Sequence, residues 1–178
     1  MELTEKASME YQTLTGELVL KEKPPEQLLA IGDIIFDVDG TLADCEHRQH
    51  FVRSKPRNWK AFNATIGDDS VHHDIVWLAK LLHHVGCRII ICTARTEDLR
   101  EVTKNWLDNN AGLKGIYQKI YMRGEKDYRD DDIIKRELLD QIRADGYDPV
   151  MVFDDRDRVV KIWREAGLRC LQVQAGDF

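Results

Sequence analysis

Two aspartates one residue apart, Asp37 and Asp39, are the pair of side chains best suited to covalent chemistry in this sequence. They follow the apolar run 34–36, and Gly40 behind them permits a tight turn. In such a loop one carboxylate can attack phosphorus, while the other protonates the leaving oxygen and then activates water. A single aspartate in this place often does no more than cap a helix. Two carboxylates followed by Gly-Thr-Leu favour a catalytic loop.

A second acidic pair, Asp154-Asp155, follows another apolar run. Two like charges at a strand end repel each other unless a cation lies between them and the first loop. Mg²⁺ prefers a near-octahedral set of oxygen ligands, so it fits the carboxylates of Asp37, Asp39 and Asp154. We expect Asp155 to support this metal site indirectly, through water or from behind the direct ligands. Asp157 is an alternative ligand, although a negative charge at a helix N-terminus explains it better.

The segment Asp-Val-Asp-Gly-Thr-Leu at 37–42 resembles the nucleophile loop of the haloacid dehalogenase (HAD) superfamily of phosphohydrolases, and Asp154-Asp155 resembles its acidic metal motif. The resemblance implies that Asp37 is the nucleophile, which forms an aspartyl-phosphate, and that Asp39 is the general acid and base. It also implies Mg²⁺ as the cofactor. The Asp37 side chain and the Asp39 backbone carbonyl would hold this ion together with the second acidic pair.

Two further residues resemble phosphate-binding groups of the same superfamily. Thr93 ends an apolar run and matches the hydroxyl that binds a phosphoryl oxygen, although a threonine at a strand end is ordinary by itself. Lys135 matches the lysine that neutralises the phosphoryl group and the nucleophile, a role that suits a compact point charge. The alternative is a solvated helix lysine, and Arg136 lies one position away.

From residue 34 to 178 the chain resembles the 3′-phosphatase domain of bacteriophage polynucleotide kinase–phosphatase and of related bacterial end-healing proteins. The closer resemblance implies that three residues, Arg48, Arg95 and Asp131, bind the substrate. The chain departs from the phage domain at Thr93, where that domain has a serine, and 49–72 has no clear match. The motifs that match occur in order along the chain: Asp37-Val-Asp-Gly-Thr-Leu-Ala with Arg48, Thr93-Ala-Arg95, Asp131-Asp-Ile-Ile-Lys135, Asp154-Asp-Arg-Asp-Arg-Val-Val, and Gln172-Val-Gln-Ala-Gly-Asp-Phe178.

The function implied by this resemblance is a magnesium-dependent phosphomonoesterase that removes 3′-phosphates from DNA or RNA ends in nucleic-acid repair. Its partners would be such ends, or nucleotides, and a separate kinase or ligase, because the sequence has no GxxxxGK[ST] loop. A nucleotidase acting on free mononucleotides is the first alternative, since it would use the same catalytic core. A catalytically idle module that binds nucleic-acid ends is the second, and the intact Asp37 and Asp39 disfavour it. The choice between DNA and RNA and the oligomeric state are left open.

The segment 47–67 contains no Asp or Glu. After Arg48, four cations are interleaved with three aromatic residues, and we consider these cations candidate substrate-binding residues. Cations between aromatic rings suit a nucleic-acid backbone with stacked bases. A solvated loop with Trp59 and Phe62 packed beneath it explains the pattern equally well. The cations are Arg53, Lys55, Arg57 and Lys60, and the aromatic residues are Phe51, Trp59 and Phe62.

The elements that must position these groups alternate along the chain. Strands that are apolar throughout, each followed by an amphipathic helix, predict an α/β fold, a Rossmann-like parallel sheet with helices on both faces. Ligands bind beyond the carboxyl ends of such strands, where the acidic pairs, Thr93 and Arg95 are expected. Only about 33 residues separate the first motif from the helix at 74, so we expect a small or absent cap and an open site. The expected strands are 34–36, 88–92, 120–122, 150–153 and 171–173, and the expected helices are 74–85, 96–106, 134–142 and 159–166.

Length and composition exclude several classes of protein. The 178 residues, 43% of them hydrophobic, suit one domain at 31–178 after a polar N-terminal extension at 1–30. A net charge of −6 excludes a generally basic protein that coats nucleic acid. No apolar run is long enough to span a membrane, and the N-terminus lacks a secretory signal pattern. Four scattered cysteines, Cys45, Cys87, Cys92 and Cys170, indicate reduced thiols and a cytoplasmic location.

Overall fold

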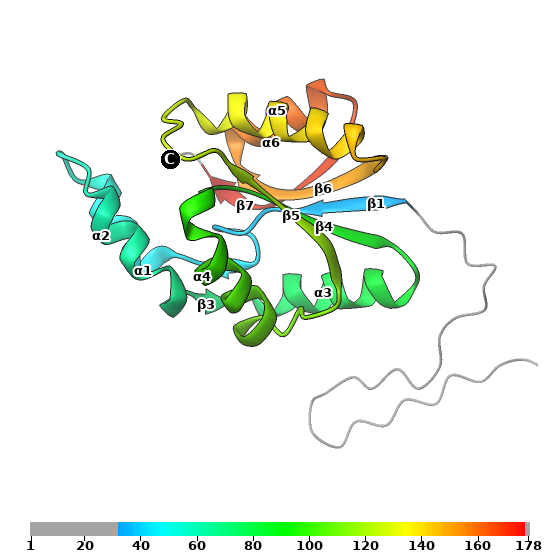
Figure 1. Cartoon of the computed structure of the whole chain (residues 1–178), viewed down its shortest axis with the longest axis horizontal. Coiled ribbons are helices and arrows are strands. Elements are labelled where there is room, and N and C mark those ends of the chain that lie inside the picture. Colours follow the sequence, from blue (N-terminus) through cyan, green and yellow to red (C-terminus); the bar gives the residue numbers. More distant parts are fainter. Residues whose placement is uncertain (1–31, 177–178) are drawn as a thin grey trace, which may run out of the picture.

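The structure is a computed structural model, which describes residues 32–176 (Figure 1). Its centre is a parallel five-stranded sheet in the order β5-β4-β1-β6-β7. The predicted Rossmann-like sheet is therefore confirmed, whereas the predicted extension at 1–30 lies outside the described residues. The strands are β1 (Asp33–Phe36), β4 (Arg88–Thr96), β5 (Tyr117–Arg123), β6 (Pro149–Arg156) and β7 (Arg169–Gly176).

Helices cover both faces of the sheet, because alternate residues of a strand point to opposite sides. Ile34 and Phe36 of β1 belong to one core, which includes Trp106, whereas Ile35 belongs to the other, which includes Trp163. The central strand is thus fixed from both sides, and its carboxyl end carries the first acidic pair. The covering helices are α3 (His73–His84) and α4 (Arg100–Asn105) with the π-helical turn η3 (Trp106–Asn110) on one face, and α5 (Asp131–Ala144) and α6 (Asp157–Glu165) on the other.

The segment 96–106 differs from the single helix expected there. Strand β4 runs on to Thr96, whose side chain makes no capping hydrogen bond, and a 3-10 turn, η2 (Glu97–Leu99), precedes α4. A tighter turn before α4 and a wider one after it rotate the helix face relative to a regular α-helix. On the resulting face Val102 is exposed and Thr103 is buried.

The segment between β1 and α3 forms a small helical insertion at the carboxyl end of the sheet (Figure 1). Its two helices contact each other and protrude from the sheet, while two short strands pair at its base. The basic segment is thus mostly helical rather than a loop, and the expected small cap is present in this form. The insertion contains β2 (Ala43–Asp44), α1 (Glu46–Arg53), α2 (Trp59–Ala64), the 3-10 turn η1 (Ile66–Asp68) and β3 (Ser70–Val71).

All four cysteines are buried and free, as expected from their spacing. Within residues 32–176, every helix is too short or too polar to cross a membrane.

Candidate active site

Three carboxylates from two strand ends meet beneath the insertion. Asp37 directly follows β1. Asp154 and Asp155 lie near the carboxyl end of β6, which is the neighbour of β1 in the sheet. All three are buried, and one oxygen of each lies within 4.8 Å of the others. Burial raises the pKa of Asp37 to about 8, and the two neighbouring carboxylates add to this shift. Burial and Asp154 also raise the pKa of Asp155, to about 7.

The local packing fits a cation among these carboxylates. Asp155 Oδ2 is buried and has no hydrogen-bond partner in the described part of the chain. Gly40 lies directly against it with a φ of +83°, and a Cβ at this position would overlap the Asp155 carboxylate. An unpartnered buried oxygen inside a cluster of like charges is the environment that a divalent cation relieves. The donor set is all oxygen, which suits Mg²⁺.

Lys135 provides the positive charge in the cluster. It comes from the second turn of α5, and its Nζ lies 2.6 Å from Asp37 Oδ1 and 2.7 Å from Asp154 Oδ2. Burial alone would lower the pKa of Lys135, but Asp154 and Asp37 raise it above its ordinary value, so the amine stays charged. Trp163 Nε1 donates to Asp154 Oδ2 at 3.0 Å and fixes that carboxylate from behind. The alternative of a solvated helix lysine is therefore wrong.

The Asp39 carboxylate turns away from this cluster towards two arginines. Arg48 Nη2 donates to Asp39 Oδ1 at 2.5 Å, and Arg95 donates to it through Nε and Nη2. Burial alone would raise the pKa of Asp39, but Arg95 and then Arg48 hold it well below its usual range. The two arginines therefore favour the charged form of Asp39 and fix its side chain at the end of the loop that follows β1.

Asp69, which the motifs did not indicate, balances the charge of the same two arginines. Its buried carboxylate accepts from Arg48 Nε at 2.6 Å and from Arg95 Nη2 at 2.8 Å, and it lies 2.9 Å from His47 Nε2. Its backbone carbonyl accepts from Trp106 Nε1. Two buried guanidinium groups, those of Arg48 and Arg95, need about two carboxylates to balance their charge. This requirement indicates that a second acidic residue besides Asp39 must lie nearby.

The other predicted binding residues are placed as follows. Thr93 is buried in β4, and its hydroxyl accepts from the Arg95 backbone N–H at 3.2 Å. Asp131, at the first position of α5, accepts from Arg123 Nη2 and Arg156 Nη1. Its carboxylate is thus occupied by cations of the protein, and any effect of Asp131 on a phosphate substrate would pass through these arginines. Its assignment as a direct substrate ligand stays a prediction.

The basic segment is only partly available to a substrate. Arg53 makes two hydrogen bonds to Glu46, at 2.5 and 2.9 Å. Lys55, Arg57 and Lys60 are exposed. Of the two aromatic residues expected beneath a loop, Trp59 is 52% exposed, whereas Phe62 packs against Arg48, whose guanidinium carbon lies 4.1 Å from the ring centroid. The insertion therefore buttresses the catalytic loop on its inner side and presents cations and an indole on its outer side.

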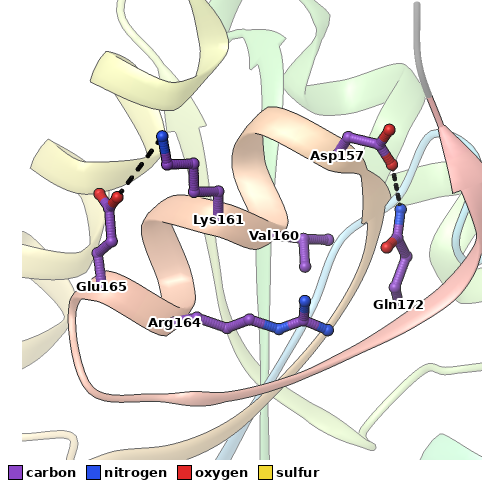
Figure 2. A pocket seen from close by; sticks show the side chains of 6 residues that line it. All are labelled: Asp157, Val160, Lys161, Arg164, Glu165 and Gln172. Carbon is purple, nitrogen blue, oxygen red and sulfur yellow. Dashed lines mark hydrogen bonds and ion pairs between the residues drawn. The ribbon is translucent and has the colours of Figure 1, made fainter.

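Asp157, the alternative metal ligand, lies outside the carboxylate cluster. It opens α6, and its carboxylate accepts from Gln172 Nε2 at 2.5 Å in a surface hollow between α6 and β7 (Figure 2). Lys161 and Glu165 form an ion pair farther along the same hollow. Gln172 also donates to the Asp155 backbone carbonyl, at 2.8 Å, so this outer pair holds the end of β6 in place.

Comparison with known proteins identifies relatives of this arrangement. Residues 32–178 match the family model of the polynucleotide kinase PNKP phosphatase domain. A protein of Autographa californica nuclear polyhedrosis virus, named as a bifunctional polynucleotide kinase/RNA ligase, is 26% identical over 152 residues, which are 82% of this chain and 20% of the viral protein.

Solved structures agree with this match. A chain in the structure of the Pnkp1/Rnl/Hen1 RNA repair complex is 27% identical with a TM-score of 0.66, and the alignment covers 93% of this chain and 51% of that chain. A haloacid dehalogenase-like hydrolase of Streptococcus pneumoniae has the same fold at 16% identity, with a TM-score of 0.59 over 80% of this chain and 84% of the hydrolase. The chain thus spans a fifth of the viral relative and about half of the repair-complex chain.

Proposed function

Because the chain belongs to the family of polynucleotide kinase PNKP phosphatase domains, HAD-type phosphatases of nucleic-acid repair, we propose that it removes 3′-phosphates from DNA or RNA ends with the help of Mg²⁺. The observation that best supports this is the buried cluster of Asp37, Asp154 and Asp155 with Lys135 beside the nucleophile. It lies at the carboxyl end of the sheet, where α/β folds bind ligands.

In the proposed reaction, Lys135 and Thr93 hold the phosphoryl oxygens while Asp37 attacks phosphorus. A bond forms between an Asp37 oxygen and phosphorus, and the bond from phosphorus to the 3′ oxygen of the substrate breaks. Asp39, once it has taken up a proton from solvent, gives this proton to that oxygen. It then takes a proton from water, which attacks the aspartyl-phosphate and releases inorganic phosphate together with the regenerated Asp37 carboxylate.

Asp39 can act in this way only after its contacts with Arg48 and Arg95 are exchanged, because two guanidinium groups stabilise its charged form. We propose that the phosphate of the substrate takes over part of these contacts. Asp69 keeps the two arginines in place and neutralised while Asp39 turns to the leaving oxygen. In this scheme Arg48 and Arg95 meet the substrate, as the resemblance implies.

Mg²⁺ would be held by the carboxylates of Asp37, Asp154 and Asp155, with the Asp39 backbone carbonyl as a further oxygen. When bound, it would neutralise the clustered negative charge and orient the phosphoryl group. Lys135 would remain beside Asp37 and share this task.

The metal site predicts a pH-dependent stabilisation by Mg²⁺. In the metal-free protein, the folded pKa values of Asp37 and Asp155, about 8 and about 7, lie above their unfolded value of 3.8. The stability that these two groups contribute is therefore fully present below about pH 4 and is lost as pH rises to the folded values. Mg²⁺ binds the deprotonated carboxylates, so it should raise Tm more at pH 8 than at pH 6. At about 100 times its Kd the gain is about 2.7 kcal/mol, or roughly 5–10 °C. Differential scanning calorimetry with Mg²⁺ and with chelator measures this difference.

Asp154→Asn is the matched variant for this measurement, since it removes one charged ligand and keeps the shape of the side chain. It should lose most of the Mg²⁺-dependent rise in Tm, whereas Asp140→Asn on the exposed face of α5 should keep it. Phosphate release should stop in excess chelator and return with Mg²⁺, but return poorly with Ca²⁺, whose looser coordination misplaces the phosphoryl group. Full activity in chelator, with equal Tm values, would remove Mg²⁺ from the proposal.

The exposed cations of the insertion predict salt-sensitive binding of an oligonucleotide. Lys55, Arg57 and Lys60 are exposed on the insertion, and contacts of these side chains with three backbone phosphates would release counterions. The slope of log KM against log salt should then be about 2 for a single-stranded 3′-phosphorylated oligonucleotide. It should be near zero for a small phosphomonoester. Arg53 should contribute less, because Glu46 already pairs with it.

Changing these three cations to glutamine should flatten the salt dependence for the oligonucleotide and leave kcat for the small ester unchanged. The matched control changes three exposed cations elsewhere, Lys119, Arg143 and Lys161, which alters the net charge equally. If both triple variants change KM for the oligonucleotide by the same factor, the effect comes from net charge alone. The insertion would then not be a binding surface for nucleic acid.

The choice of substrate is tested by comparing kcat/KM for a 3′-phosphorylated oligonucleotide, its 5′-phosphorylated twin and the matching mononucleotides. The proposal expects the first to be preferred. A preference for mononucleotides would favour the nucleotidase alternative. The Pnkp1/Rnl/Hen1 complex and the viral kinase/ligase support a further proposal, that a kinase and a ligase act on the same ends as this domain in the cytoplasm.

A further inference from the structure

Tyr128 is the most exposed of the large hydrophobic side chains in the described part of the chain, and the proposed reaction gives it no role. Its side chain is 89% exposed, and it lies in the loop 124–130 between β5 and α5. That loop stands at the carboxyl end of the sheet, as do the helices of the insertion (Figure 1). Lys135, which touches Asp37, lies one turn into the helix that follows the loop, about 6 Å along its axis from the first residue of that helix.

The backbone that carries Tyr128 is held in place from below. Arg123 Nη1 donates to the carbonyl of Asp127 at 3.0 Å and to the carbonyl of Arg129 at 2.7 Å, so the residues on both sides of Tyr128 are bound to one nitrogen. Arg129 in turn pairs with Asp127 and Glu137. Hydrogen bonds therefore hold the backbone on both sides of an aromatic ring that is exposed to solvent.

The same guanidinium joins this loop to the strand ends that carry the chemistry. Arg123 Nε donates to the carbonyl of Ala94, between Thr93 and Arg95, at 2.9 Å. Arg123 Nη2 donates to Asp131, and that carboxylate also accepts from Arg156, which directly follows Asp155. The backbone around Tyr128 is thus linked to the end of β4 by Arg123, and to the end of β6 by Arg123, Asp131 and Arg156 in turn.

We propose that Tyr128 is a stacking platform for one of the last two bases of the nucleic-acid end, a specificity-determining contact for polymer over small phosphate esters. This inference rests on the proposed function. An aromatic ring stacks on any base, so the platform suits an enzyme that must accept ends of every sequence. The loop and the insertion would then hold the polymer from two sides, the loop through a base and the insertion through phosphates.

The test measures kcat/KM for phosphate release from a single-stranded 3′-phosphorylated oligonucleotide by wild type and three variants. Tyr128→Ala and Tyr128→Leu should lower it about 10-fold, since neither offers a ring face, whereas Tyr128→Phe should stay within about two-fold. With glycerol phosphate, which has no base, all four proteins should be equal. Trp77→Ala is the matched control, because Trp77 is another exposed aromatic residue, on α3.

Oligonucleotides with an abasic site at the terminal or the penultimate position locate the stacked base. At one of these positions, the missing base should lower kcat/KM of wild type by the same factor as Tyr128→Ala does on the intact oligonucleotide. For the Tyr128→Ala variant, the same abasic substrate should cause no further loss of kcat/KM. Equal activity of wild type and Tyr128→Ala on the intact oligonucleotide would overturn the inference and leave the proposed function standing. So would a loss that persists with both abasic substrates. A wild type that hydrolyses glycerol phosphate but not the oligonucleotide would overturn the proposed substrate and this inference together.

Discussion

Asp37→Asn is expected to lower kcat by at least about 10⁴-fold on every substrate, because an amide does not attack phosphorus at a useful rate. The fold should survive the change. Asparagine keeps the shape of the side chain, and Lys135 retains its 2.7 Å contact with Asp154. Removing one of three clustered like charges should leave Tm at pH 8 unchanged or higher in the metal-free protein.

Two measurements separate a lost nucleophile from a damaged site. Acid-quenched wild type should carry a phosphoryl group on the peptide that contains Asp37, and the variant should carry none. Asp140→Asn, on the exposed face of the helix that bears Lys135, should keep wild-type turnover. A folded Asp37→Asn protein that retains more than a few per cent of activity would show that another group attacks phosphorus.

The sheet could be predicted from the sequence because its central strands are apolar on both faces. Ile34, Ile35 and Phe36 have no exposed surface, and a short run of β-branched and aromatic residues that ends at a turn signal is typical of a buried strand. The insertion could not be predicted in this way. Helix α1 buries Arg48 and Gln49 rather than apolar residues, so its inner face carries no hydrophobic pattern. Helix α1 is held instead by the ion pairs of Arg48 with Asp39 and Asp69.

The site residues divide in the same way: those placed by apolar strands can be predicted from the sequence, and those placed by charged partners cannot. Asp37, Asp154 and Thr93 follow apolar strands, so topology alone brings them to one edge. Asp69 and Arg123 act through partners distant in sequence: Arg95 lies 26 residues after Asp69, and the Ala94 carbonyl lies 29 residues before Arg123. Nothing in their local sequence shows those partners. The motif predicts that Asp131 binds the substrate, and it gives no sign that two arginines of the protein hold this carboxylate.

Asp39→Asn is expected to lower kcat by about 10²–10⁴-fold for an alkyl phosphate such as a nucleic-acid 3′-phosphate. An alkoxide leaves poorly without a proton, and the amide supplies none. A nitrophenolate leaves without protonation, so the variant should still form the aspartyl-phosphate from nitrophenyl phosphate. Its hydrolysis should then be slow, because no carboxylate activates the water. The expected result is a burst of nitrophenolate equal to the enzyme concentration, followed by slow turnover and accumulation of phosphorylated Asp37.

The burst distinguishes a proton-transfer role of Asp39 from its visible role as a partner of Arg48 and Arg95. If Asp39 only neutralised these arginines, the amide would weaken binding of both phosphate esters by a similar factor, with no burst and no trapped phosphoenzyme. Asp69→Asn is the matched variant, since it removes a carboxylate from the same two arginines without touching the loop of Asp37. It should lower activity on both esters together. Equal patterns for the two variants would assign Asp39 to holding the arginines and leave the proton transfer to another group.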